Sequence, residues 1–178
     1  MEEFIRYLKD NTRIRYLGLC YGAQLLAQAL GGKVEKMSDT LRKGNDEVFL
    51  NDEFYNQPYV KAYKELYERK PKTLSYVKVH QDHITVLPKE AKLLASSNTT
   101  EVEIFCVGER FLAIQGHPES TSDFTCSLAP SVKLSEADDE AIEAFEKQKA
   151  QTISERYSIK ESKFEFLTIL SNFLKNTY

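Results

Sequence analysis

The sequence contains few residues that break a chain or cross-link it. Among 178 residues there are seven glycines, five prolines, three cysteines and no tryptophan. We find no Gly- or Pro-rich linker, no low-complexity segment and no internal repeat, so one domain spanning residues 1–178 is expected. Cys20, Cys106 and Cys126 are odd in number, far apart and without CxxC spacing. This pattern excludes a disulfide framework and a cysteine zinc site.

Long apolar runs and a charge excess of one sign are also missing. No apolar run approaches the length that spans a membrane, and residues 1–6 lack the apolar region of a secretory signal. The formal net charge is only -3, and the basic residues are scattered among acidic ones. Such a surface offers no basic stripe for nucleic acid. We expect a cytoplasmic protein that binds neither membranes nor nucleic acids.

What the sequence does contain is a buried strand that runs straight into a buried helix. The apolar run 14–19 predicts the strand, and the Ala-, Leu- and Gln-rich segment 21–30 predicts the helix. Gly31 and Gly32 supply its C-terminal stop. Apolar residues occupy most sides of this helix, so we expect it to be buried. The combination favours an α/β fold with a mostly parallel sheet.

The remaining segments alternate between helical and strand patterns. We expect further helices at 2–8, 59–67, from Ser135 past Phe145, and around 164–174. Strands are expected at 74–79 and 84–87, and a hairpin with arms 102–107 and 110–115. Segment 38–58 is polar with little periodicity, and we interpret it as loop with short strand pieces.

The strongest local motif is Gly18-Leu19-Cys20-Tyr21-Gly22, a G-x-C-x-G at the strand-to-helix junction. This is the cysteine form of a nucleophile elbow, in which a sharp turn strains the backbone at the nucleophile. The thiol then lies at a helix N-terminus, where the dipole favours a thiolate, and the Tyr21 N–H can serve as an oxyanion donor. The alternative is that Cys20 is a small buried hydrophobic residue, and the motif alone does not decide.

A second motif supports the catalytic interpretation. His117-Pro118-Glu119 directly follows a predicted strand. Residues two apart in an extended turn project similarly, so Glu119 can orient the imidazole of His117. A cysteine, a histidine and an orienting acid are the minimum set for acyl transfer through a thioester.

His80 and His83 flank Asp82, a pattern that raises the question of a metal. Two histidines and one acid on a short loop are a weak signature, and no third ligand cluster is visible. We therefore expect no metal here, and interpret these residues as polar caps at a strand end near the substrate pocket.

Three segments together resemble the class I glutamine amidotransferase family, including its GMP synthase-like and γ-glutamyl peptidase-like members. They are 17–34 around Cys20, 79–88 around His80, and Ile114-Gln115-Gly116-His117-Pro118-Glu119; the resemblance covers about 14–120. It implies a three-layer, flavodoxin-like fold, and a helical part over 121–178 is expected. It also implies hydrolysis of a γ-glutamyl amide without cofactor, with Cys20 as nucleophile, His117 as acid and base, and Glu119 as orienter. Gln24 and His80 would contact the substrate.

The chain departs from the family pattern at its start. The family domain begins well upstream of the nucleophile, whereas 19 residues precede Cys20 here. We therefore expect an N-terminally truncated sheet that lacks the loop with the second oxyanion donor. The chain is then a fragment, a subunit completed by another polypeptide, or an inactive relative. Two functions stay open: an enzyme acting on glutamine or a γ-glutamyl small molecule, alone or with a synthase subunit, and a non-catalytic interaction subunit.

Overall fold

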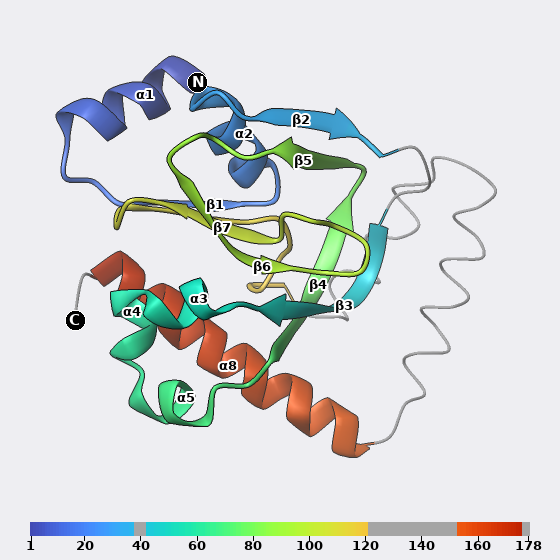
Figure 1. Cartoon of the computed structure of the whole chain (residues 1–178). Coiled ribbons are helices and arrows are strands. Elements are labelled where there is room, and N and C mark those ends of the chain that lie inside the picture. The colour runs from blue at the N-terminus through green and yellow to red at the C-terminus, as the bar shows by residue number, and fades with distance from the viewer. Residues whose placement is uncertain (38–41, 121–152, 176–178) are drawn as a thin grey trace.

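The computed structural model describes residues 1–37, 42–120 and 153–175, and it places two groups of helices on opposite faces of a sheet (Figure 1). The six-stranded sheet has the order β1-β8-β7-β6-β3-β4, and β2 and β5 form a separate pair. The strands are β1 (Tyr16–Leu19), β2 (Lys33–Lys36), β3 (Arg42–Leu50), β4 (Thr73–His80), β5 (Asp82–Val86), β6 (Ala91–Ser96), β7 (Ile104–Val107) and β8 (Phe111–Ile114). The helices are α1 (Glu2–Asn11), α2 (Tyr21–Ala29), α3 (Asp52–Asn56), α4 (Pro58–Lys61), α5 (Lys64–Arg69) and α8 (Ile153–Lys175).

The predicted α/β class with three layers is confirmed. β1 and β8 are parallel, with Leu19 opposite Ile114, so the carboxyl ends of these two strands lie side by side. The pairs β3–β4, β3–β6, β6–β7 and β7–β8 are antiparallel, which makes the sheet mixed over the described residues. The parallel pair is therefore located where the predicted nucleophile and base leave the sheet.

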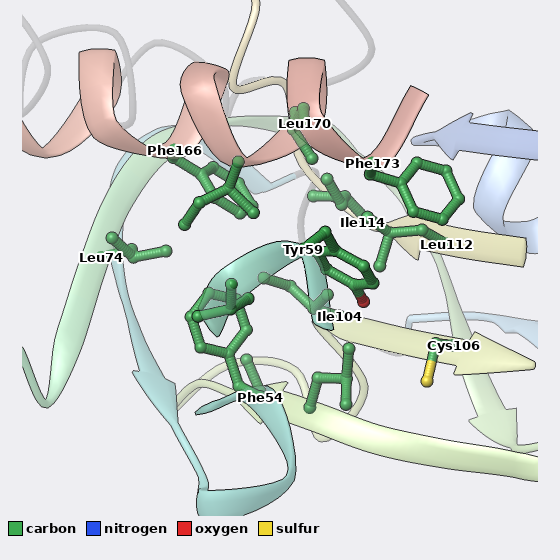
Figure 2. Close-up of a cluster of buried hydrophobic side chains, with 14 of the residues drawn as sticks. Phe54, Tyr59, Leu74, Ile104, Cys106, Leu112, Ile114, Phe166, Leu170 and Phe173 are labelled. Carbon is green, nitrogen blue, oxygen red and sulfur yellow. The ribbon is translucent and has the colours of Figure 1, made fainter. Parts of the chain in front are cut away.

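One core lies between the sheet and the layer formed by α8 and the short helices α3 to α5. Phe173 of α8 and Tyr59 of α4 are fully buried and meet edge to face, with ring centroids 5.2 Å apart. Figure 2 shows Phe166, Leu170 and Phe173 of α8 facing side chains of β7 and β8. The far end of the described chain thus completes the same core as the strands that carry the site.

A second core lies on the opposite face, under α1 and α2. Ile5 and Leu8 of α1 are buried with Ala23 and Leu26 of α2 against the other side of β7 and β8. With apolar side chains packed on both faces, β7 and β8 are buried at every residue. This explains why both hairpin arms are continuous apolar runs, which is typical of a fully covered strand.

The sequence predictions were wrong mainly in segment 38–58. Residues 42–50 form one nine-residue strand, β3, of which eight residues pair in register with residues of β4. A partner strand, and not local periodicity, determines this element.

The expected helix 59–67 is divided into α4 and α5, and β2 and β6 were not predicted. The predicted α1, β1, α2, β4, β5, the β7–β8 hairpin and α8 are confirmed near their expected positions; the helix from Ser135 and Cys126 lie outside the described residues.

Candidate active site

Cys20 lies in a sharp turn between β1 and α2. Its φ is 49° and its ψ is -107°, a conformation that is strained for any residue other than glycine. Two sets of hydrogen bonds hold it there. Its N–H donates to the Ile114 carbonyl of β8 at 2.8 Å, and its own carbonyl accepts from the N–H groups of Ala23 and Gln24 at 3.0 and 3.2 Å. The half-buried side chain is thus fixed at the N-terminus of α2.

Gly18 is required because α2 returns very close to β1. A Cβ at Gly18 would lie 2.6 Å from the carbonyl oxygen of Gly22, a distance that real Cβ atoms do not tolerate. The same carbonyl accepts a hydrogen bond from the Tyr16 hydroxyl at 2.8 Å. The Tyr16 hydroxyl therefore connects β1 to the first turn of α2, and together with the close approach of Gly18 and Gly22 it fixes the turn at Cys20.

His117 is held in the turn after β8 by the backbone of β4. Its N–H donates to the Val77 carbonyl at 2.7 Å, an isolated bridge between the two segments. Its Nδ1 lies 2.8 Å from Oε1 of Glu119. The preceding Gly116 packs against the Tyr76 ring so closely that a Cβ would lie 2.3 Å from a ring carbon. The imidazole is thus fixed by backbone, carboxylate and packing together.

The electrostatics connect His117 to Cys20. A hydrogen bond with the Cys20 side chain and a second with Glu119 raise the pKa of His117 from 6.5 to about 10, although partial burial opposes the change. Both contacts favour the protonated form of the imidazole. The Cys20 Sγ also lies 3.6 Å from the Val79 carbonyl, which accepts a hydrogen bond from the thiol. Glu119 is thus the carboxylate bonded to His117, and the Cys20 side chain is near enough to raise the pKa of the same imidazole.

The other predicted site residues lie near Cys20 and His117. Gln24 is buried, and its Nε2 donates to the Asp82 carbonyl at 2.8 Å and lies 3.5 Å from Oε1 of Gln115. His80 is also buried, with Nδ1 3.0 Å from the same Asp82 carbonyl. Substrate contact by Gln24 and His80 stays a prediction. Tyr21 is the first residue of α2, so its N–H is among those that have no acceptor within the helix.

Neither a metal cluster nor a membrane span is present in the part of the chain that the structure describes. No group of three or more His, Cys, Asp or Glu side chains there could hold a metal ion. No helix among those residues combines the length and apolar character needed to cross a bilayer.

Comparison with known proteins identifies the family. The family model described as "Glutamine amidotransferase class-I" matches residues 1–125, which include the Cys20 elbow and the His117 turn. The chain belongs to the class-I glutamine amidotransferase family. This confirms the resemblance that the three sequence segments indicated.

Curated relatives of the chain include γ-glutamyl peptidases and GMP synthases. Gamma-glutamyl peptidase 4 of Arabidopsis thaliana is 40% identical over 130 residues, which are 73% of this chain and 49% of that protein. A GMP synthase [glutamine-hydrolyzing] of Malacoplasma penetrans is 33% identical over 112 residues, 62% of this chain and 20% of that protein. The chain thus spans about half the length of the curated peptidases it matches.

Solved structures agree with the family fold. A glutamine amidotransferase of Thermotoga maritima has a TM-score of 0.63 at 19% identity and covers 97% of this chain and 67% of its own. A protein of Thermoplasma acidophilum described as a putative GMP synthase subunit has a TM-score of 0.51 at 29% identity, covering 66% of this chain and 53% of its own.

Sequence reasoning missed several residues that shape this amidotransferase site. Tyr16 and Tyr76 fix the two turns, and no motif marks either of them. Lys78, in contrast, could have been noticed in the sequence, because a lysine within the apolar run 74–79 is a signal of a buried charge. Its ion-pair partners, Asp46 of β3 and Glu103 just before β7, are far from it in the sequence and could not be found from spacing alone.

Proposed function

We propose that this chain carries the glutaminase-type site of an amidotransferase and hydrolyses a γ-glutamyl amide through a cysteine thioester. Cys20 is the nucleophile, His117 the general acid and base, and Glu119 the group that orients His117. The observation that supports this proposal is the half-buried imidazole with hydrogen bonds to both Cys20 and Glu119. An imidazole held by a carboxylate beside a cysteine in a strained turn at a helix N-terminus is an arrangement suited to thiolate chemistry.

The reaction proceeds in two halves. The Cys20 thiolate attacks the γ-carbonyl carbon, and the oxyanion that forms accepts a hydrogen bond from the Tyr21 N–H. The His117 imidazolium donates its proton to the departing nitrogen as the C–N bond breaks, which leaves a γ-glutamyl thioester. His117 then takes a proton from water, the resulting hydroxide attacks the thioester, and glutamate leaves as the Cys20 thiolate is restored.

The substrate is a γ-glutamyl compound, and its leaving group distinguishes two versions of the proposal. The relatives named gamma-glutamyl peptidases favour a γ-glutamyl peptide, from which an amine departs. The relatives named GMP synthase favour glutamine itself, with ammonia passing to a synthase subunit. Either version needs a reduced thiol, and for that reason we propose a cytoplasmic location.

A glutamine-analogue electrophile tests the nucleophile. We expect the full chain to be labelled at Cys20, as read by peptide mass spectrometry, and to release ammonia or amine from glutamine or a γ-glutamyl peptide. Cys20→Ala should abolish both signals, because no thiolate remains to attack, whereas Cys106→Ala should keep both. A folded chain that neither reacts nor hydrolyses would contradict the proposal and support the alternative, a non-catalytic amidotransferase-like interaction subunit.

A further inference from the structure

A buried charged cluster that the proposed mechanism does not use lies between β3, β4 and the approach to β7. Lys78 of β4 is 1% exposed. Its Nζ forms ion pairs with Asp46, at 2.6 Å from Oδ2, and with Oε1 of Glu103, and it lies 2.9 Å from the Ser97 hydroxyl. Burying an ammonium and a carboxylate is costly unless the two are paired. The pairing therefore fixes the positions of Lys78 and Glu103 relative to each other.

Glu103 connects this cluster to the segment that carries His117. Its Oε1 accepts from Lys78 and, at 2.7 Å, from Ser97, while Oε2 accepts from the Tyr76 hydroxyl at 3.2 Å. Its backbone carbonyl accepts from the Gln115 N–H at 2.8 Å. Glu103 is therefore bonded both to β4 and to the residue that is two positions before His117.

Tyr76 connects Glu103 to the turn that carries His117. Its ring presses on Gly116 on one side and is stacked with Phe166, with centroids 5.9 Å apart. Burial, followed by the charge of Glu103, raises the pKa of Tyr76 well above its ordinary value, so the hydroxyl keeps the proton that it donates. The ring that supports Gly116 is thus held at its far end by the Glu103 carboxylate.

We propose that Glu103 is a positioning residue for His117, acting through the Tyr76 hydroxyl and ring to hold the His117 turn against Cys20. The inference rests on the proposed function, because it concerns the geometry of the same base. A base displaced by about 1 Å can lose roughly 10²-fold in rate, so a group that fixes the turn controls the reaction without touching the substrate.

Asp46 provides a matched control. It shares Lys78 with Glu103 and accepts from the Thr99 hydroxyl at 2.8 Å, on the side of the cluster formed by β3. Asp46→Asn and Glu103→Gln each remove one negative partner of the same lysine and keep the shape of the side chain. They differ in the hydrogen bond to Tyr76, which Glu103 accepts.

The experiment measures alkylation of Cys20 by iodoacetamide at neutral pH, resolved by peptide mass spectrometry, together with kcat and KM on a γ-glutamyl peptide. For Glu103→Gln we expect about tenfold slower alkylation and a lower kcat at an unchanged KM, because a displaced His117 stabilises the thiolate less. Asp46→Asn should stay within about threefold of the parent chain. Equal effects of the two variants, in proportion to their losses of thermal stability, would overturn the inference.

Tyr76→Phe is the variant that keeps the fold safest, since it removes only the hydroxyl and leaves the ring on Gly116. It should slow alkylation in the same direction as Glu103→Gln, and parent-like alkylation in Tyr76→Phe would also overturn the inference. His117→Ala separates the two hypotheses. If alkylation of the parent chain does not depend on His117, the proposed function fails; if it does, and Glu103→Gln matches Asp46→Asn, only the positioning role fails.

Discussion

The side chain of Glu119 is the simplest position at which to change the pKa of His117 by substitution. The pKa of His117 is raised by the hydrogen bond with Cys20 first and with Glu119 second. A raised pKa means that the protonated ring stabilises the folded state. That stabilisation is complete below pH 6.5 and is lost as the pH rises through about 10. Glu119 therefore contributes to the upper limit of the pH range in which His117 can donate a proton, together with the larger effect of Cys20.

Glu119→Gln should lower the pH at which His117 deprotonates. The substitution removes the second cause of the raised pKa and leaves the Cys20 contact, so the transition should fall between 6.5 and about 10. Histidine NMR titration of the folded chain measures it directly, and the alkaline limb of hydrolysis should move in the same direction. Glu109→Gln, a change at an exposed turn, is the control and should leave the transition in place. An unchanged His117 transition in Glu119→Gln would refute this account.

Among the elements, the junction of β1 and α2 leaves least room for substitution. At Gly18 a methyl group would overlap the Gly22 carbonyl, whereas at Gly22 the nearest atom to a methyl group would be the Tyr16 hydroxyl at an ordinary 3.5 Å. The two glycines of this motif are thus present for different physical reasons. Gly18 permits the close approach of the helix, and Gly22 lies in the first helical turn.

Gly18→Ala should destabilise the fold by about 1–3 kcal/mol, because the added carbon forces β1 and α2 apart. Gly22→Ala is the matched variant and should be neutral or stabilising by up to roughly 1 kcal/mol, since alanine favours the helix. Urea denaturation gives both free energies of unfolding. Equal losses at the two positions would show that the close contact at Gly18 does not limit the junction.

Local patterns predicted those elements whose residues determine their own structure. The strand, turn and helix around Cys20 and the apolar arms of β7 and β8 were found because propensity, glycine placement and burial agree. β3 was missed because its residues 42–47 are mostly polar and become a strand only by pairing with β4. Cys20, His117 and Glu119 could be proposed as site residues because each lies in a short local motif. The ion pair of Lys78 and Glu103 has no such motif and became visible only in the assembled sheet.

At the scale of the whole molecule, α8 anchors the core beneath the site strands. Phe173 is fully buried against Tyr59, and Arg15 lies over its ring at 5.2 Å from the centroid. Phe164, in the middle of the same helix, is 69% exposed. The two phenylalanines therefore separate the effect of burial from that of helix composition.

Phe173→Ala should lower the free energy of unfolding by about 3–5 kcal/mol, because it opens a cavity between α8 and the sheet. Phe164→Ala should change it by no more than about 0.5 kcal/mol. Thermal and chemical denaturation of the full chain measure both. If the two variants were equally stable, α8 would not be a structural part of this core.

The parallel pairing of β1 with β8 also has a consequence for folding. Cys20 and His117 are 97 positions apart, and they meet because these two strands dock in register. Joining such distant segments carries a high loop-closure entropy, which delays their contact. In a refolding time course, enhanced thiol reactivity at Cys20 should therefore develop after most of the helical signal has returned, so that one chemical probe reports when this long-range contact is made.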